Sequence, residues 1–233
     1  MPASVGKVIP VSAPARVRAH LRGAPDGPVP VVHRGRHAVY VDVAGRCVGV
    51  VGAVATAVPC ALRVGTADLG GIRGDRAHLR GGVLHLDGTP LGIGRIADVR
   101  VPSLRVTAGS ATAEAIPPAA VAGLVGRGAG LTPLGDDVLC GWLAVLRAAG
   151  VATPEVDAAV RDALHRTTLL SATLLDCAMH GEVIPEFAAY VTSLGTAAEP
   201  DRAAALAAVG HTSGSGMLDG ARLALTALPG VAE

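Results

Sequence analysis

The sequence predicts an α+β fold in which an N-terminal β-rich part, built like a small barrel or sandwich, packs on a C-terminal α-helical part. Between Val29 and Val106, short runs of Val, Leu and Ile are separated by Gly, Pro and Asp, which is typical of many short strands. After about Ser110 the chain becomes rich in Ala and Leu, as helices are. We therefore expect an N-terminal segment at residues 1–27, a β-rich domain at 28–113, and a helical domain with Gly-rich motifs at 114–233.

Two predicted turns connect consecutive strands as hairpins. Residues 38–43 alternate in polarity, and Ala44-Gly45-Arg46 can connect them to a second strand at 47–51. Asp87-Gly88 follows a strand-like run at 83–86, and this pair is a strong hairpin signal because both positions tolerate positive φ. Two further strands are expected at residues 96–101 and 104–106.

Residues typical of helix starts and ends recur in the second half of the chain. Thr153-Pro154-Glu155 combines a capping hydroxyl, a proline with a preset φ and an acid at the positive end of the helix dipole. We expect the helix that begins there to continue to His180, with Gly181 just after its end. The other helices are expected at residues 119–124 and 138–149, from Pro185, from Pro200, and at 217–228.

Composition excludes several classes of protein. The net charge is +1 and aromatic residues make up 2% of the chain, so nucleic acid is not an expected partner. The longest uncharged stretch, residues 47–62, is interrupted by Gly, Thr and Pro and is too short to span a membrane as a helix. The N-terminus has no apolar core of a signal peptide, and the four cysteines lack paired spacing. We expect a cytoplasmic protein with reduced thiols and no membrane contact.

The densest local motif covers residues 125–137. Three glycines at alternate positions let the backbone turn and approach a ligand closely, and the helix that follows offers unpaired N–H groups to an anion. Two acids fit such a site if a hard cation such as Mg²⁺ bridges to substrate oxygens, or if one acid accepts amide hydrogens from a urea-like group. The alternative is that they only stabilise the helix dipole. The residues concerned are Gly126, Gly128, Gly130, Thr132, Asp136 and Asp137.

A second motif, residues 213–220, aligns without gaps on residues 134–141. Each segment leads into a helix whose second turn carries a glycine, Gly141 or Gly220. Glycine inside a helix costs about 1 kcal/mol relative to alanine, so its presence indicates that one helix packs closely on another. The two joints would set opposed helix N-termini around one small pocket, with His211 as a candidate acid or base. The alternative is a capped helix whose histidine bonds to backbone.

A third polar cluster lies on the long helix predicted after Thr153. Spacings of three and four residues place the hydroxyls of Thr167, Thr168 and Ser171 on one helix face. Arg166 is a planar fork suited to a carboxylate or phosphate, although such a cluster can also be an ordinary polar stripe. Residues 33–37 are expected to form a solvated turn, although the alternative that they reach across to the helical loops stays open. Cys140 is expected to be a buried thiol, not a nucleophile.

Three segments, in this order along the chain, resemble the signature of the AllH family: residues 130–141, residues 166–171, and residues 210–214 together with Gly220. The family is linked to oxamate carbamoyltransferase. The resemblance implies a subunit of a complex in which phosphate cleaves oxalurate to oxamate and carbamoyl phosphate, a step of allantoin and hence purine breakdown. It also implies FdrA-like and AllG-like partner subunits. Where Gly216 stands in this sequence, the family commonly has an acid.

Together, the motifs and the resemblance give the candidate site. Asp136, Asp137 and His211 are the candidate catalytic residues, and the two aspartates are also the candidate Mg²⁺ ligands. The candidate substrate- and anion-binding residues are Gly128, Gly130, Thr132, Arg166, Thr167, Thr168, Ser171, Thr212, Ser213, Gly214 and Ser215.

Two other functions stay open at this point. One is a non-catalytic module that binds a small acid and holds or regulates partner subunits. The other is metal-assisted hydrolysis of an amide or ureido bond through Asp136 and Asp137. The sequence requires no cofactor besides the optional Mg²⁺, and it leaves open whether the chain forms a homo-oligomer.

Overall fold

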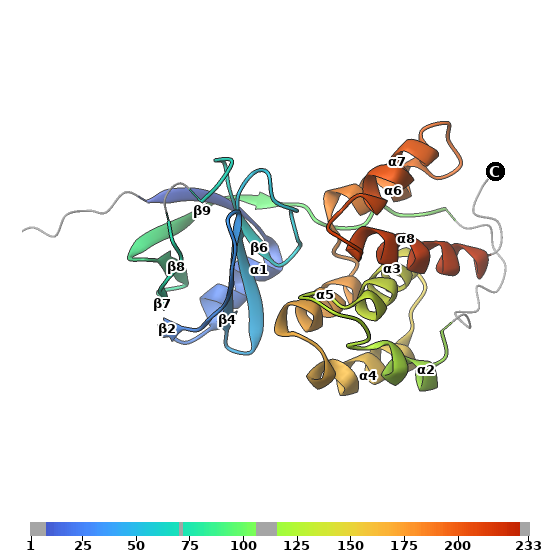
Figure 1. Cartoon of the computed structure of the whole chain (residues 1–233), viewed down its shortest axis with the longest axis horizontal. Coiled ribbons are helices and arrows are strands. Elements are labelled where there is room, and N and C mark those ends of the chain that lie inside the picture. The colour runs from blue at the N-terminus through green and yellow to red at the C-terminus, as the bar shows by residue number, and fades with distance from the viewer. Residues whose placement is uncertain (1–7, 70–71, 106–115, 229–233) are drawn as a thin grey trace, which may run out of the picture. The chain divides into compact units, whose positions relative to one another are not determined.

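A computed structural model describes residues 8–69, 72–105 and 116–228 of the chain. It divides into two compact units, of which the first ends at Asp98 and the second begins at Val99. The strands belong to the first unit and nearly all the helices to the second (Figure 1). The predicted α+β class, with a β-rich N-terminal part and a helical C-terminal part, is confirmed.

The first unit is a nine-stranded, nearly closed, barrel-like sheet. Its strand order is β2-β7-β8-β9-β1-β6-β5-β4-β3. The strands are β1 (Ile9–Pro14), β2 (Gly27–Val29), β3 (Val31–Arg34), β4 (Ala38–Val43), β5 (Arg46–Val51), β6 (Ala61–Val64), β7 (Ala77–Arg80), β8 (Val83–Leu86) and β9 (Thr89–Ala97).

The central strand of this sheet, β1, and the helix that follows it were not recognised from the sequence. β1 pairs in parallel with β9 and antiparallel with β6. Helix α1 (Ala15–Gly23) adds Val17 and Leu21 to the core, where both are almost fully buried. Prolines at both ends of the short β1 segment and a serine within it leave no hydrophobic run to detect, so its place is set by tertiary contacts.

Both predicted hairpins are confirmed. Ala44 and Gly45 have φ values of 49° and 81°, and Asp87 and Gly88 have values of 50° and 81°. Positive φ at both central residues is the conformation whose twist matches that of the flanking strands. The Asp87 carboxylate also accepts hydrogen bonds from three backbone N–H groups, those of Gly74, Asp75 and Arg76.

The strand expected at residues 96–101 is largely wrong. β9 already ends at Ala97, and beyond it Arg100 forms only an isolated bridge with Glu182. Of the strand expected at 104–106, Leu104 is not in a strand, and Val106 lies outside the described residues. The apolar residues that suggested these strands pair instead with helix ends: the Leu104 N–H donates to the Ala148 carbonyl.

The second unit is helical. Its elements are α2 (Pro118–Leu124), α3 (Leu134–Ala148), α4 (Pro154–Ala163), a 3₁₀ turn (Leu164–Arg166), α5 (Leu169–Met179), α6 (Pro185–Ser193), α7 (Glu199–Ala207) and α8 (Ser213–Thr226). Within the described ranges of the chain, no helix is both long enough and apolar enough to cross a membrane.

The single helix expected from Pro154 to His180 is wrong. The chain leaves helical geometry at Thr167, whose φ and ψ are −124° and 179°, and α5 then begins anew. The Thr168 hydroxyl caps this new helix by accepting a hydrogen bond from the Ser171 N–H at 3.1 Å. The competing N-cap therefore overrides the continuous helical pattern. Gly181, at φ 69°, follows the end of α5 as expected.

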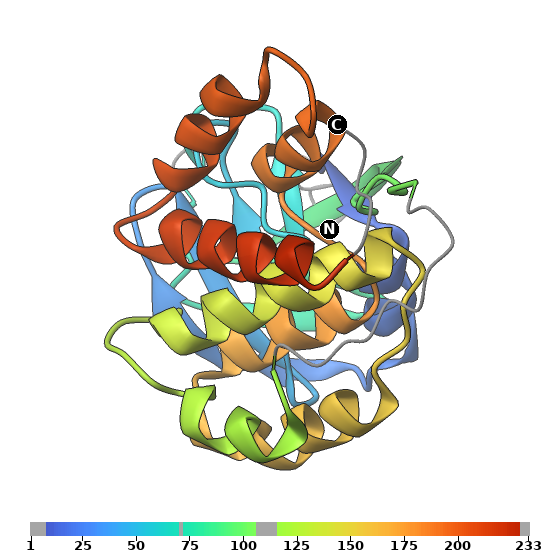
Figure 2. The same cartoon turned by 90° about the vertical axis from the view of Figure 1, so that its right-hand side faces the viewer.

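Helices α3 and α8 pack unusually closely, side by side (Figure 2, yellow and red). A Cβ added at Gly141 would lie 2.0 Å from the Met217 carbonyl oxygen, and one at Gly220 would lie 1.9 Å from that of Val138. The close packing predicted from these two glycines is confirmed. Both helices begin four residues earlier than expected, so their Gly- and Asp-containing segments form the first helical turns.

Arg147 joins three helices at the other end of α3. Its guanidinium donates to both carboxylate oxygens of Asp157 at 2.6 and 2.7 Å, to the Thr153 hydroxyl at 2.9 Å, and to the Val151 and Met179 carbonyls at 2.8 Å. These bonds link α3 to the start of α4 and the end of α5. Arg147 and Asp157 each have 16% of their side-chain surface exposed, so solvent screens the pair weakly.

Candidate functional site

The first turns of α3, α5 and α8 meet in the second unit. Ser171, in the first turn of α5, donates to Asp136 in the first turn of α3 at 2.6 Å. Thr132, just before α3, lies 2.8 Å from Ser213 at the start of α8, measured between the hydroxyl oxygens. We call these three helix starts, together with the loop at residues 125–133, the helix-start cluster. The structure thus brings together the three motifs found in the sequence.

The starts of α3 and α8 lie side by side and point in the same direction. Gly216 faces Leu134 and Asp137, while one turn further on Gly220 faces Val138. The expected opposition of the two N-termini is therefore wrong, because close glycine contacts align the helices in parallel. Two positive helix ends next to each other favour negative charge at this point.

Asp136 links the loop, α3 and the start of α5 through hydrogen bonds to its carboxylate. Its side chain is fully buried, and its Oδ1 accepts a hydrogen bond from the Gly126 N–H at 2.8 Å. Its Oδ2 accepts from the hydroxyls of Thr167 and Ser171. Both carboxylate oxygens are therefore engaged, and binding a metal or substrate at Asp136 would require these bonds to open. This geometry gives Asp136 a positioning role between the loop, α3 and α5.

The loop glycines have different reasons for being glycine. Gly126 has φ 76°, and a Cβ there would lie 2.2 Å from the Arg166 carbonyl oxygen. Gly128 has φ 122°, and its added Cβ would lie 2.8 Å from the Leu134 nitrogen. Gly130 has φ 95° but faces open space. Two of the three glycines therefore allow close backbone packing, and only Gly130 leaves an open approach to the loop.

Some N–H groups expected to bind an anion are already paired. The Gly135 N–H donates to the Arg127 carbonyl and the Gly214 N–H to the Val209 carbonyl, both at 2.9 Å. The preceding loops fold back over the helix starts and cap them. The remaining capacity of the cluster to bind a ligand therefore depends more on its side chains than on these backbone donors.

Asp137 is the exceptional side chain of the cluster. It is only 4% exposed, and its Oδ2 has no hydrogen-bond partner. The pKa of this carboxyl is raised from 3.8 to about 7, chiefly by burial; a hydrogen bond from Ser213 opposes the rise, and the Asp136 charge adds to it. Asp137 therefore changes its protonation state near neutral pH and keeps one oxygen unpaired.

Two neighbours shape the surroundings of Asp137. A Cβ at Gly216 would lie 2.9 Å from the Asp137 Cβ, so position 216 has no room for an acid here. Ser213 bonds to both Asp137 and Thr132. Since Ser213 has one hydroxyl hydrogen, when it donates to Asp137 it must accept from Thr132. A chain of hydrogen bonds then runs from the half-buried Thr132 to the buried carboxyl.

The other predicted site residues differ in their positions. Thr168 belongs to the cluster and donates to the Leu131 carbonyl at 2.5 Å. Ser215 is exposed and donates weakly, at 3.4 Å, to the Ala207 carbonyl. Arg166, His211 and Thr212 are exposed, and their side chains form no hydrogen bond within the described part of the structure. Arg166 and His211 are therefore near the cluster in sequence but are not engaged with its aspartates.

Metal and thiol chemistry can be examined on the same residues. Across residues 8–69, 72–105 and 116–228, no three His, Cys, Asp or Glu side chains are grouped so that they could hold a metal ion. The pKa of Cys140 is raised well above its ordinary value by burial and by the carboxylates of Asp137 and Asp136. The thiolate is thus disfavoured, as expected for an inert thiol.

Two partners in the cluster were missed from the sequence. No residue type in the sequence indicates that the Gly126 N–H or the Leu131 carbonyl will form these hydrogen bonds, because nearly every residue carries the same backbone groups. The Gly126 N–H pairs with Asp136, and the Leu131 carbonyl gains its partner because the break at Thr167 places the Thr168 hydroxyl near the loop. A capping threonine followed three residues later by Ser171 was the one local signal for that break.

His33 and Arg34 are the last two residues of β3, and residues 35–37 connect β3 to β4. The Gly35 N–H donates to the Ala38 carbonyl at 2.8 Å, and Arg34 forms an ion pair with Asp75 in which each side chain is about half exposed. The solvated turn expected at residues 33–37 is therefore shorter than predicted: Gly35 and Arg36 are exposed in the connection, whereas His33 belongs to β3 and His37 is half-buried.

The fold and the cluster define a two-unit α+β chain whose helical unit joins three helix starts around a buried carboxyl that titrates near neutrality. Residues 124–225 match the family described as oxamate carbamoyltransferase subunit AllH, and this segment contains the whole cluster from Gly126 onward. The resemblance to the AllH family predicted from the sequence is thereby confirmed over the helical unit. No curated protein and no solved structure matches the chain.

Proposed function

We propose that this chain is a subunit of a carbamoyltransferase complex and that its helix-start cluster binds a small ureido or carbamoyl anion. The observation that carries the proposal is the unpaired, buried Oδ2 of Asp137 beside the starts of two parallel helices. A buried polar atom without a partner is costly, and a ligand that supplied the partner would remove that cost. The AllH match over residues 124–225 supports the same assignment.

The chemistry of Asp137 suits a ureido compound. Near pH 7 its protonated form can donate to a carbonyl or carboxylate oxygen, and its ionised form can accept an N–H of an amide or ureido group. Ser213 and Thr132 extend this polar site toward the half-exposed part of the cluster. The aligned dipoles of α3 and α8 favour the negative charge of an acid substrate.

The reaction proposed is phosphorolysis of oxalurate. A phosphate oxygen attacks the carbamoyl carbon, the bond from that carbon to the oxamate nitrogen breaks, and carbamoyl phosphate and oxamate form. The proton lost from phosphate ends on the departing nitrogen. In this proposal Asp137 passes that proton, and its pKa of about 7 supports the role because an acid–base group works best when its pKa lies near the operating pH. FdrA-like and AllG-like subunits are the proposed partners, and the cytoplasm is the proposed location.

The test compares Asp137→Asn with Asp219→Asn in a complex reconstituted from this chain and its FdrA-like and AllG-like partners. Asp219 is an exposed acid in the second turn of the neighbouring helix α8, so its variant controls for the loss of an acid outside the cluster. We expect Asp137→Asn to lower phosphate-dependent carbamoyl phosphate formation by about 100-fold or more while assembly is retained. Equal turnover of both variants and the wild type would contradict a role of Asp137 in the reaction.

A non-catalytic binding module is the second candidate, because most polar groups of the cluster already satisfy one another. Asp136, Thr168 and Gly126 all have partners within the chain. In that case Asp137→Asn would weaken binding of oxalurate or oxamate to the chain, measured by calorimetry, and leave the turnover of the assembled complex unchanged.

A further inference from the structure

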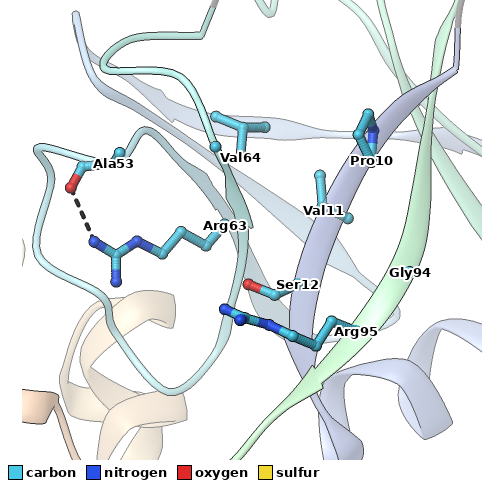
Figure 3. A pocket seen from close by; sticks show the side chains of 9 residues that line it. Pro10, Val11, Ser12, Ala53, Arg63, Val64, Gly94 and Arg95 are labelled. Atoms are coloured by element: carbon cyan, nitrogen blue, oxygen red, sulfur yellow. Dashed lines mark hydrogen bonds between the residues drawn. The ribbon is translucent and has the colours of Figure 1, made fainter.

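A pocket in the first unit lies outside the cluster described above and outside the segment that matches AllH. It has a volume of about 540 Å³ and opens on the sheet over β1 and its two neighbours, β6 and β9 (Figure 3). This volume is within the range of about 300–1,000 Å³ typical of small-molecule sites. None of the residues that line it is acidic.

Two arginines flank a serine across three neighbouring strands. Ser12 on β1 is directly opposite Arg63 on β6 and also opposite Arg95 on β9. Residues directly opposite each other on adjacent strands project from the same face of a sheet, and adjacent strands are about 4.8 Å apart. The neighbours of Ser12 along β1, Val11 and Ala13, belong to the core, so the row Arg63–Ser12–Arg95 faces away from it.

A β-bulge gives the pocket its shape. Val11 is paired with Ile93, but Ser12 is paired with Arg95, so Gly94 is an extra residue on β9. A bulge bends a strand locally and redirects the side chain that follows it. A Cβ added at Gly94, or at Gly65 on the opposite side, would meet nothing within 4 Å. Bare backbone and open space therefore lie between the two arginines.

The two guanidinium groups keep donors available for a ligand. One nitrogen of Arg63 donates to the Ala53 carbonyl at 2.9 Å, and its other N–H groups have no hydrogen-bond partner among the described residues. Arg95 forms no hydrogen bond or ion pair with any residue that the structure describes. Figure 3 shows its guanidinium beside the Ser12 hydroxyl.

We propose that this pocket binds a phosphorylated small molecule, with the phosphate held by Arg63, Arg95 and the Ser12 hydroxyl. Arginine forks match the oxygens of phosphate and form charge-assisted hydrogen bonds with them. Each carboxylate of a dicarboxylate such as malonate has two coplanar oxygens, which one fork occupies, and a methylene holds the two groups apart. A phosphate instead presents all its oxygens around one atom, where two forks and a hydroxyl can share them. The rest of the pocket leaves room for the organic part of the ligand. This site shares no residue with the helix-start cluster and does not depend on the proposed function.

The experiment follows the backbone amide NMR signals of the full chain during titration with pyrophosphate, inorganic phosphate and malonate at low ionic strength. Pyrophosphate and phosphate should shift the amides of Ser12, Gly65 and Gly94, and malonate should bind at least about tenfold more weakly. Signals near Ser213 report the helix-start cluster separately, so a phosphate bound there is not mistaken for this site.

Matched variants complete the test. Arg63→Gln and Arg95→Gln should each weaken pyrophosphate binding by about tenfold or more, since each removes a charge-assisted contact. Arg80→Gln, an exposed arginine on β7, should bind as the wild type does. Gly94→Leu keeps both arginines but fills the pocket, and it too should abolish the shifts. The proposal is overturned if the Ser12, Gly65 and Gly94 signals do not respond, if the arginine variants bind normally, or if malonate binds as well as phosphate.

Discussion

At the scale of single residues, two adjacent acids in one helical turn have different environments. Asp136 accepts three hydrogen bonds and is fully buried, whereas Asp137, at 4% exposure, has an oxygen with no partner. Sequence alone gave both residues the same candidate roles. The structure separates them into an acceptor that holds segments together and a carboxyl whose protonation is free to change.

Asp136→Ala should destabilise the protein by at least about 3 kcal/mol, because it leaves a buried N–H and two hydroxyls without their acceptor. Urea denaturation monitored by circular dichroism measures this change. The exposed Asp219→Ala should stay within about 0.5 kcal/mol of the wild type. A wild-type stability for Asp136→Ala would refute the positioning role.

Asp137→Asn should alter how stability depends on pH. The folded-state pKa is raised to about 7, so between about pH 4 and pH 7 the folded chain holds a proton that the unfolded chain releases. This contribution to wild-type stability is full below about pH 4 and is lost as pH rises through 7, by at most about 1.4 kcal/mol per pH unit. Asparagine cannot ionise, so the variant should gain stability relative to the wild type over this interval. Urea denaturation of both proteins at pH 5 and pH 8 measures this difference in the free energy of unfolding. The same difference at both pH values would contradict the raised pKa.

At the scale of elements, the second unit depends on glycine contacts between two helices. Gly141→Ala should cost about 1–3 kcal/mol or more, because the new methyl would collide with the Met217 carbonyl and separate α3 from α8. Gly123→Ala on α2 is the matched control: its Cβ would meet nothing within 4 Å, so the ordinary gain of up to about 1 kcal/mol should appear. Thermal denaturation of both variants gives the comparison, and a stabilised Gly141→Ala would be incompatible with the close contact.

Arg147 provides a second test of the same unit. Arg147→Met should destabilise it by about 3 kcal/mol, since Asp157 would remain largely buried without its cation. Hydrogen exchange should then increase at the start of α4 and the end of α5, which Arg147 connects. Unchanged protection at both places would show that the network does not link these helices.

The elements predicted best from the sequence are those set by local chemistry. Asp87, Gly88 and Gly45 tolerate the positive φ that a two-residue hairpin turn requires, and both hairpins form. Strand β1 was missed because it pairs with the distant strands β6 and β9. The break at Thr167 had one local signal, the Thr168 cap, and the bond from Thr167 to the distant Asp136 that supports it has no local signal. In the site, Gly141 and Gly220 correctly predicted the close packing of two helices. No neighbouring residue in the sequence indicated that Asp136 and Asp137 would have different environments.

At the scale of the whole molecule, the two units of the chain carry different candidate sites. The helical unit carries the AllH match and the helix-start cluster. The barrel-like unit has its own core and an arginine-flanked pocket that lies outside that match. The proposed carbamoyltransferase role therefore belongs to the helical unit, while the phosphate site proposed in the barrel-like unit can be tested independently of it.

¹³C NMR of the Asp137 carboxyl carbon, followed across a pH titration with and without oxalurate, would show whether Asp137 titrates near neutrality and responds to the proposed substrate. We expect this carboxyl to titrate near pH 7 in the free chain, and its chemical shift and midpoint to change when oxalurate is added. A midpoint near 4 that oxalurate leaves unchanged would contradict the proposed role of Asp137 at the meeting point of these helices.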